Sequence, residues 1–327
     1  MSHGVPQWYR QRPVTVIGGL GFLGINLTMS LAGLGARVTV VTRSLDRHRA
    51  EVSDCKARGV AVREGDLRDQ DAMRAAVAGQ DVVFNLAGQS GAVQSLNDPF
   101  TDLDVNCRGN LVLLEALRAE NPAARMVFVG SRLTYGRTGP DPVNEERTPA
   151  PLCAHAVHKV AVEQYLTVYH QVYGLSFAAA RLTNPYGPGQ PRERTAYGVV
   201  NRLIHLALTG DTLPIYGDGL QRRDYIYVDD AVAALVALGE SSAANGRIYN
   251  VGSGVGTPMV EMAGAITAMA GAGRLEFVEW PLLAGLIETG DFIADISRIR
   301  REVGWEPRTT LEDGLQRTVA FYRAHAA

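Results

Sequence analysis

Residues 13–24, PVTVIGGLGFLG, decide the fold class of this chain. The stretch opens with an apolar, β-branched run that indicates a buried strand, and the apolar spacing from Phe22 onward indicates a helix. The two patterns are separated by Gly18, Gly19, Gly21 and Gly24. This spacing satisfies GxxGxxG and GxGxxG, and it lets backbone N–H groups and the positive end of a helix face the pyrophosphate of a dinucleotide. A purely structural glycine-rich turn is the alternative interpretation.

The same alternation of strand and helix continues through the first half of the chain. Apolar, β-branched runs predict strands at 13–19, 36–42, 59–66, 80–88, 124–131 and 175–182. Helical apolar spacing, ended by glycine or proline, predicts helices at 22–34, 100–119 and 156–173. Repeated βαβ units give a parallel sheet with helices on both faces. We therefore expect an α/β fold, a doubly wound parallel sheet of the Rossmann type.

The second half breaks this alternation and predicts a smaller, C-terminal substrate-binding domain. Residues 184–195 are rich in Pro, Gly and Arg and predict a loop. Beyond it the chain predicts a strand, turn and strand at 215–230, a helix at 229–239, a strand at 247–254 and a helical end from about 295. We assign 12–183 to a dinucleotide-binding domain, to which 226–256 returns, and 184–327 mainly to the substrate-binding domain. Residues 1 to about 12 are expected to be a tail.

Composition and charge exclude several classes of protein. The chain has 327 residues, of which 46% are apolar and 20% charged, as in ordinary globular proteins. Lys and Arg number 32 against 34 Asp and Glu, so no basic excess is available to neutralise nucleic-acid phosphates. No apolar run approaches the ~20 residues that span a bilayer, and the N-terminus lacks the apolar segment of a signal peptide. We expect neither a nucleic acid nor a membrane as partner.

The cysteines indicate a reducing environment. Cys55, Cys107 and Cys153 lie far apart and form no CxxC or Cys/His spacing. We therefore expect no disulfide framework and no metal site, and the cytoplasm is the expected location.

Residues at the ends of three predicted strands complete the expected cofactor site. Arg43 stands where NAD-binding chains carry an acidic residue for the ribose hydroxyl, and an arginine there can hold the 2′-phosphate of NADP. Arg43 lying over the adenine is the alternative. Asp66 follows the third strand, where it would meet the adenine, and the fourth strand ends in Asn-Leu-Ala-Gly at 85–88. The residues expected to contact NAD or NADP here are Gly18, Gly21, Phe22, Leu23, Gly24, Arg43, Asp66, Leu67, Leu86, Ala87 and Gly88.

Several further stretches carry a family resemblance. They are NLAG (85–88), DVNCRGNLVLLEALR (104–118), RLTNPYGPG (181–189), IYGDGLQRRDYIYVDD (215–230), YNVGSG (249–254) and VGWEP (303–307). With these and the glycine turn, the chain resembles the extended short-chain dehydrogenase/reductases, the NAD-dependent epimerase/dehydratase family that acts on nucleotide sugars. The likeness covers residues 13–325. It implies a homodimer formed through the helices at 100–119 and 156–173.

The resemblance also implies how cofactor and substrate are held. Asn106 would be a structural residue near the nicotinamide, and residues 213–216 would lie along the nucleotide base. Asn184 and Arg223 would hold the substrate pyrophosphate, a role that suits the planar fork of arginine. A surface ion pair with Asp224 is the alternative for Arg223. The residues expected to contact the substrate are Gln89, Ser131, Asn184, Tyr216 and Arg223.

Three residues are the catalytic candidates. Family members use a Ser or Thr, a Tyr and a Lys, the last two being four residues apart on one helix face. Ser131 and Lys159 match the first and the last, but His155 stands at the Tyr position. Ser131 would then hold the sugar hydroxyl and Lys159 the nicotinamide ribose. Because imidazole titrates near neutral pH, His155 can accept and return the hydroxyl proton; a polar helix residue without a catalytic role is the alternative.

Neighbouring groups offer alternatives to His155. Cys153 is a candidate base only if its thiol pKa is lowered. Glu145 and Glu146 lie in the loop before the helix, and His158 is turned round the helix from the Lys159 face. Tyr135 belongs to the Tyr-Gly pair of the family and is expected to be structural.

Two departures from the family bear on the reaction. Ser131 is followed by Arg132 and Leu133 and not by the acidic pair of the hexose 4,6-dehydratases, which counts against dehydration. Residues 287–295 lack the arginine that many relatives place on the sugar nucleotide. The prediction is an NAD(P)-dependent epimerase of a nucleotide-activated sugar that works through a transient ketone. An NADPH-dependent keto-sugar reductase, a sugar dehydratase and a non-catalytic dinucleotide-binding sensor are the alternatives.

Overall fold

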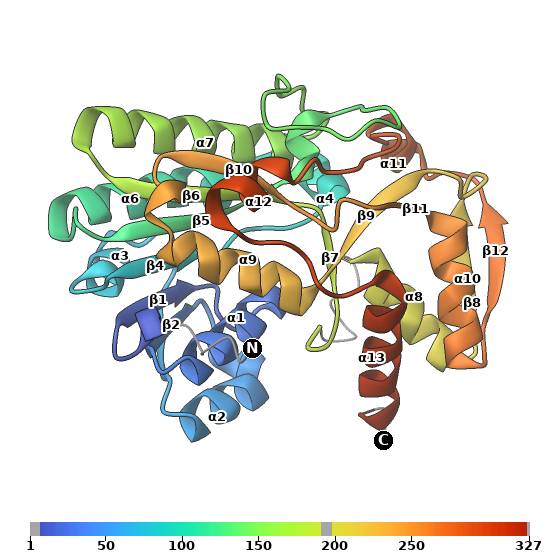
Figure 1. The fold of residues 1–327 in the computed structure, drawn as a ribbon, viewed down its shortest axis with the longest axis horizontal. Helices are drawn as coiled ribbons and strands as arrows, with labels where there is room; N and C mark the ends of the chain where they lie inside the picture. Colours follow the sequence, from blue (N-terminus) through green and yellow to red (C-terminus); the bar gives the residue numbers. More distant parts are fainter. Residues whose placement is uncertain (1–6, 191–197, 326–327) are drawn as a thin grey trace.

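The computed structural model describes residues 7–190 and 198–325, and over these residues its centre is a seven-stranded parallel sheet (Figure 1). The strands are β1 Pro13–Ile17, β2 Arg37–Thr42, β3 Ala61–Glu64, β4 Val82–Asn85, β5 Arg125–Ser131, β6 Ser176–Leu182 and β10 Arg247–Val251. Their order is β10-β6-β5-β4-β1-β2-β3, so the direction of winding reverses between β1 and β4. This order and the parallel pairing confirm the predicted doubly wound α/β fold, and the central strands β1, β2 and β4 are rich in buried β-branched residues.

Helices cover both faces of this sheet and bury two apolar clusters. On one face lie α1 Phe22–Gly33, α2 Arg49–Ala57 and α9 Val228–Glu240. On the other lie α3 Gln70–Val77, α6 Gly109–Glu120 and α7 Ala154–Tyr173. The helix α7 ends at Gly174 in the left-handed region, with φ of 72°, which favours glycine. These two layers fix the carboxyl ends of the strands as one edge of the molecule.

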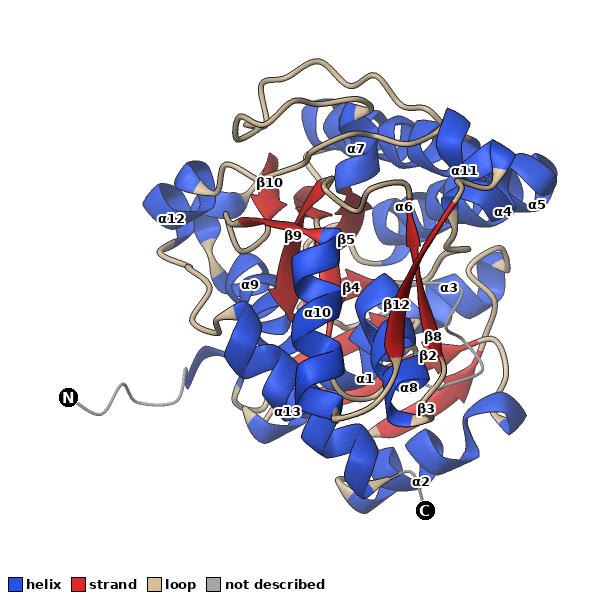
Figure 2. Cartoon of the chain, turned by 90° about the vertical axis from the view of Figure 1, so that its right-hand side faces the viewer, coloured by secondary structure: helices blue, strands red, loops and turns tan. Residues whose placement is uncertain are grey.

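The C-terminal half adds a smaller lobe beyond that edge (Figure 2). Its helices are α8 Val199–Leu208, α10 Met259–Ala270 and α13 Leu311–Ala324, which pack on one another. The strand β8 Thr212–Tyr216 pairs with β12 Arg274–Val278, and β9 Arg222–Tyr227 lies between β7 Asn184–Tyr186 and β11 Gly256–Pro258. Short helices are α4 Ala92–Asn97, α5 Pro99–Leu103, α11 Leu282–Leu286 and α12 Ser297–Val303.

Three expectations need correction. The prediction of an N-terminal tail is wrong for residues 7–12, because Tyr9 is fully buried and its hydroxyl donates to the carbonyl of Val236. The helix at 100–119 is interrupted by a π-helical turn, Asp104–Arg108, between α5 and α6. The loop at 184–195 contains β7, and its part from 191 lies outside the described residues. Within the described residues, no helix combines the length and apolar character needed to cross a bilayer.

Candidate active site

The glycine turn joins β1 to α1 beside the reversal in strand order, where ligands of open α/β sheets bind. Gly18 has φ of +79°, and a Cβ there would stand 2.7 Å from the backbone nitrogen of Ala87. A Cβ at Gly24 would overlap the carbonyl oxygen of Gly18. Because α1 begins after Gly21 without a side-chain cap, its first N–H groups are available to an anion. The turn therefore fits the pyrophosphate of a dinucleotide.

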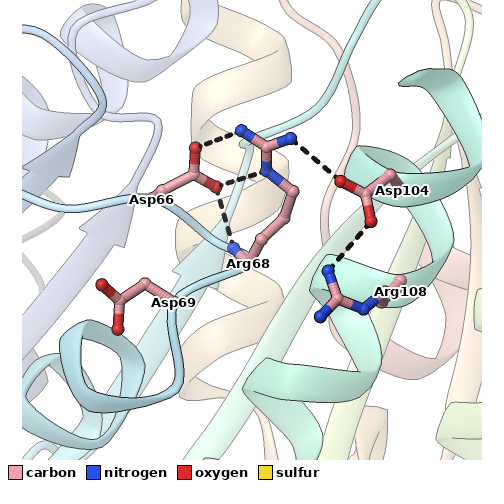
Figure 3. A pocket seen from close by; sticks show the side chains of 5 residues that line it. All are labelled: Asp66, Arg68, Asp69, Asp104 and Arg108. Atoms are coloured by element: carbon pink, nitrogen blue, oxygen red, sulfur yellow. Dashed lines mark hydrogen bonds and ion pairs between the residues drawn. The ribbon is translucent and has the colours of Figure 1, made fainter.

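A polar hollow lies where the sequence predicts the adenine (Figure 3). Both carboxylate oxygens of Asp66 accept from Arg68, at 2.9 Å from Nε and 2.7 Å from Nη2, and Nη1 of Arg68 donates to Asp104 at 2.9 Å. Hydrogen bonding to Arg68 lowers the pKa of Asp66, and Arg43, exposed just beyond β2, adds to the effect. Leu67 is 3% exposed, so its side chain belongs to the core. The sequence analysis missed Arg68, which pairs with Asp66, the residue expected to contact the adenine.

The end of β4 is tied to the π-helical turn. Asn106 is fully buried, its Oδ1 accepts from the backbone N–H of Gln89 at 3.0 Å, and its Nδ2 donates to the Gln89 carbonyl at 2.8 Å. This two-way contact fixes the orientation of the Asn106 amide. Leu86 and Ala87 are half-buried before it, and Gly88 is exposed. The structure thus brings the predicted residues 86–89 and Asn106 together at the carboxyl edge.

Lys159 contacts the carboxyl end of β5, the strand whose last residue is Ser131. The Nζ of Lys159 donates to the carbonyl of Val129, two residues before Ser131, at 2.8 Å. Burial lowers the pKa of Lys159 to about 8, against the opposing charges of Asp102 and Glu163. The Oγ of Ser131 accepts from the backbone N–H of Leu133. His155 is one turn before Lys159 on the same helix, α7.

A buried carboxylate lies behind His155. Asp102 is fully buried on α5, and its Oδ1 is 2.6 Å from Nδ1 of His158. Its Oδ2 is 3.7 Å from Nδ1 of His155, which is 8% exposed. Burial acts to raise the pKa of Asp102, but polar contacts with His155, Asn106 and His158 outweigh it and hold that pKa below its ordinary value. The carboxylate is therefore ionised and shared by two histidines.

Arg223 stands in the buried part of the C-terminal lobe. It is 5% exposed, and its guanidinium pairs with the Glu288 carboxylate and the Gly290 carbonyl. The alternative of a surface ion pair with Asp224 is wrong. That carboxylate instead accepts from the backbone N–H groups of residues 253, 254 and 294. Arg223 is therefore a buried cation paired with Glu288. This glutamate belongs to residues 287–295, the segment that lacks the arginine of many relatives.

A second buried arginine lies beside it. Arg132, directly after Ser131, donates from Nη1 to Thr289 Oγ1 at 3.0 Å and from Nε to Asn184 Oδ1 at 3.4 Å. Burial lowers the pKa of Arg132 to about 9, and the charge of Arg223 adds to this. The Nδ2 of Asn184 donates to the Asp224 carbonyl, so its amide joins Arg132 to the strand β9 that carries Arg223. This arrangement places two guanidiniums and an amide where an anion would be stabilised.

The predicted residues 213–216, with Tyr216 as the last, lie in β8 at the edge of this lobe. The Tyr216 ring is half-buried, and its centroid lies 5.2 Å from that of Trp280. Leu213 and Ile215 point inward and are fully buried. The half-buried side of β8 therefore presents an aromatic pair, of which the sequence analysis named only Tyr216.

The other groups near His155 are unsuited to its role. Burial raises the pKa of Cys153, so a thiolate is disfavoured. Burial also raises the pKa of Glu145, which accepts from the backbone N–H of Asn250, and Glu146 is 80% exposed. Tyr135 is fully buried, and its hydroxyl donates to Asn250 Oδ1 at 2.7 Å, a structural contact. Among the described residues, no group of three or more His, Cys, Asp and Glu is placed to hold a metal ion.

Comparison with known proteins shows the family to which this chain belongs. The model of the NAD dependent epimerase/dehydratase family matches residues 14–252. The chain belongs to the NAD dependent epimerase/dehydratase family. It is 34% identical over 314 residues to a UDP-glucose 4-epimerase of Mycolicibacterium smegmatis, covering 94% of this chain and 97% of that one. The members of this family are enzymes that act on nucleotide sugars, and the recognition made from the motifs is confirmed.

Other family members differ in reaction. A dTDP-glucose 4,6-dehydratase of Streptomyces griseus is 32% identical over 318 residues, covering 95% of this chain and 94% of the relative. The solved UDP-glucose 4-epimerase of Thermus thermophilus, a complex with NAD, superposes with a TM-score of 0.84 at 31% identity, covering 95% of this chain and 99% of that one. The family thus contains two of the reactions that the sequence analysis kept open, epimerisation and dehydration.

Besides Arg68 and Trp280, the sequence analysis missed the site roles of Asp102, Arg132 and Glu288. Asp102 and His155 are far apart in sequence, and only the packing of α5 on α7 joins them. Spacing inside α5 gives a weak signal, because a lone Asp in an apolar helix is uncommon unless it is paired. Glu288 was noticed as an absent arginine and not as the partner of Arg223.

Proposed function

We propose that this enzyme is an NAD-dependent epimerase that inverts a hydroxyl-bearing carbon of a nucleotide sugar through a transient ketone. The observation that carries the proposal is the contact of Lys159 with Val129 near the end of β5, the strand that ends in Ser131, with His155 one turn before Lys159 on α7. These side chains supply a hydroxyl donor, a proton acceptor and a cation at one place. The 4-position is favoured because relatives named for this family act at C4.

The residues of the glycine turn and of the β4 edge would hold NAD. The N–H groups at the start of α1 would hold its pyrophosphate, Asp66 and Arg43 would hold the adenosine end, and Asn106, which fixes the backbone of Gln89, would support the nicotinamide end. When bound, NAD would supply the reversible hydride transfer that the reaction needs. NAD is preferred over NADP because the Thermus thermophilus epimerase carries NAD. Arg43, exposed beyond β2, keeps NADP as the alternative.

The chain's own residues move the hydroxyl proton. Ser131 Oγ is turned past the strand end and donates a hydrogen bond to the reacting oxygen. His155 accepts the hydroxyl proton as the ketone forms and gives it back after the sugar has turned. Lys159, a buried cation, stabilises negative charge on the oxygen and contacts the nicotinamide ribose. Holding these groups in place around the sugar lowers the activation barrier. The product is an isomer with the same mass as the substrate.

The C-terminal lobe holds the nucleotide diphosphate. Arg223 and Asn184 contact the pyrophosphate, which would compete with Glu288 for the guanidinium. Arg132 adds a second cation at the sugar side of that pyrophosphate. Tyr216 and Trp280 offer ring faces to the nucleotide base, and Gln89 lies at the sugar end.

A dehydratase on the same scaffold is the second candidate, supported by the similarity to the Streptomyces griseus enzyme. Elimination of water needs an acid to protonate the leaving hydroxyl. Arg132 and Leu133 occupy the two positions after Ser131, where the resemblance to the hexose 4,6-dehydratases implies an acidic pair for this step. This favours the epimerase over the dehydratase.

The test is turnover of a panel of UDP- and dTDP-sugars with NAD, followed by chromatography and mass spectrometry of the product. The expected product has unchanged mass and a new retention time. A wild-type product that has lost the mass of one water would establish the dehydratase instead, and no product from any donor would refute both. In the active reaction, His155→Ala should lower kcat by about 100-fold or more. Unchanged kcat in that variant would exclude His155 as the proton acceptor.

Three further proposals concern the oligomeric state, the domains and the location of the protein. A homodimer would form through the predicted helices at 100–119, which are α5 and α6, and 156–173, which is α7; there Phe100, Val172 and Tyr173 are 81%, 64% and 49% exposed. The division into a dinucleotide-binding domain, 12–183 with 226–256, and a substrate-binding domain, 184–327, stays a proposal, and the pairing of β10 with β6 supports the returning segment. A cytoplasmic location stays a prediction, supported by Cys55, Cys107 and Cys153, which are all buried and free.

A further inference from the structure

We propose that Asp102 is a positioning residue that holds His155 in the tautomer able to accept a proton at Nε2. The inference rests on the proposed function, in which His155 accepts the hydroxyl proton. Nothing in the motifs names Asp102. It lies on α5, which packs against α7 and so brings the carboxylate behind the imidazole.

The argument starts from the two neighbours of His155 Nδ1. One is Asn106 Nδ2 at 3.3 Å, and the other is Asp102 Oδ2 at 3.7 Å. The Asn106 amide is fixed by its paired contacts with the Gln89 backbone, so it can only donate towards Nδ1. The Asp102 carboxylate can only accept. The two neighbours therefore favour opposite tautomers of one ring.

Only one tautomer suits a proton acceptor. For Nε2 to take the hydroxyl proton, Nδ1 must already carry hydrogen, and that hydrogen needs an acceptor in a buried site. Asp102 Oδ2, 3.7 Å from Nδ1, is the acceptor that the proposal assigns to this hydrogen. Among the described residues no hydrogen bond to Oδ2 is formed, although the Asn106 amide also contributes to the low pKa of this carboxylate. Once His155 has taken the second proton, the same carboxylate stabilises the imidazolium charge.

His158 fixes the carboxylate in turn. Its Nδ1 lies 2.6 Å from Asp102 Oδ1, and it is one helical turn from His155 on α7. With Oδ1 held there, rotation of the carboxylate is restricted and Oδ2 stays directed at His155. The N-terminal end of α7 is further fixed by the backbone N–H of His155, which donates to Ser95 Oγ at 3.0 Å on α4.

The charge balance also favours this role. The charged or titratable groups around His155 are Asp102 on α5, His158 and Lys159 on α7, and Cys153 before it. Lys159 disfavours a second cation one turn away, and Asp102 is the only anion of this set. The neighbouring acid Glu163 is paired with Arg181 on β6. Asp102 thus lets His155 become charged beside Lys159.

The decisive variant is Asp102→Asn, with Asp98→Asn as matched control. Asp98 is one turn earlier on the same helix, exposed and capping Thr101 N–H, a role that Asn fills equally well. We expect Asp102→Asn to lower kcat about 100-fold, with KM and the Kd of NAD changed less than about 3-fold. The acidic limb of its kcat profile should move to lower pH, because the imidazolium has lost its anion. Asp102→Glu should recover part of kcat.

A second measurement keeps the inference testable if Asp102→Asn fails to fold. Nitrogen-15 NMR of the histidines in the wild-type enzyme, assigned through His155→Gln, reports which ring nitrogen carries hydrogen. Hydrogen on Nδ1 supports the inference, and hydrogen on Nε2 alone in the neutral ring overturns it. A kcat for Asp102→Asn within about 3-fold of the Asp98→Asn control also overturns it. Failure of wild-type turnover would instead refute the proposed function and leave the NMR result to decide the pairing.

Discussion

The buried Lys159 predicts an unusual link between pH and stability. Burial lowers the pKa of Lys159 from 10.5 to about 8, which means that the folded protein holds this proton less well than the unfolded chain. A pKa difference of about 2.5 corresponds to about 3 kcal/mol. Below pH 8 both states are protonated and the folded state carries the whole cost. Above pH 10.5 neither is protonated, so the free energy of unfolding should rise by about 3 kcal/mol across that window.

The perturbation is Lys159→Met, which removes the charge and keeps the length of the side chain. At pH 7 the variant loses the Val129 contact, worth about 1 kcal/mol, but also the larger cost of a buried charge. We expect it to be at least as stable as the wild type there and to have lost turnover. Between pH 8 and 10.5 the wild type should then gain about 3 kcal/mol relative to the variant.

The assay is urea unfolding followed by circular dichroism at closely spaced pH values. The difference between wild type and variant cancels the titration of the other groups. Lys56→Met is the matched control, because Lys56 is exposed and should show a difference that does not depend on pH up to 10. A flat difference for Lys159→Met across pH 8 to 10.5 would refute the reasoning, as would a variant several kcal/mol less stable than the wild type at pH 7.

Other changes have equally definite expected results. Arg223→Ala should raise KM for the nucleotide sugar by about 10- to 100-fold in initial-rate assays, because a charge-assisted contact of roughly 1.5–3 kcal/mol is lost; an unchanged KM would remove Arg223 from the pyrophosphate site. Cys153→Ser should leave kcat within about 3-fold, because the pKa of the buried thiol is raised, and a large loss would reopen the thiolate alternative. Val172→Asp, on the exposed face of α7, should convert a dimer to a 35.2 kDa monomer in light scattering, whereas an unchanged mass would place the interface elsewhere.

The fold could be predicted from local pattern because its strands are buried on both faces. The run 14–17 is made of β-branched residues, and the run 126–129 is apolar, which leaves little ambiguity about type. The N-terminal segment could not be placed in this way. Tyr9 is anchored by the Val236 carbonyl, more than two hundred residues later, and no local pattern encodes such a contact.

The sequence could name candidate residues where they match a motif. Ser131, His155 and Lys159 were named from the family resemblance and stay predictions, and the glycine turn follows from a strand and helix that flank it. Asp102 and Glu288 could not be predicted, because each acts on a residue more than fifty positions away. Their roles depend on packing between elements, which the order of residues along the chain does not reveal.

The most direct measurement is the mass of the product that the enzyme forms from an active nucleotide sugar in D2O with NAD present. An epimerase that returns the same hydride to the same carbon gives an isomer of unchanged mass, with no carbon-bound deuterium after exchange back into H2O. This is the result we predict. A product that has lost water and gained one carbon-bound deuterium would contradict it, because elimination draws a hydrogen from the solvent onto carbon.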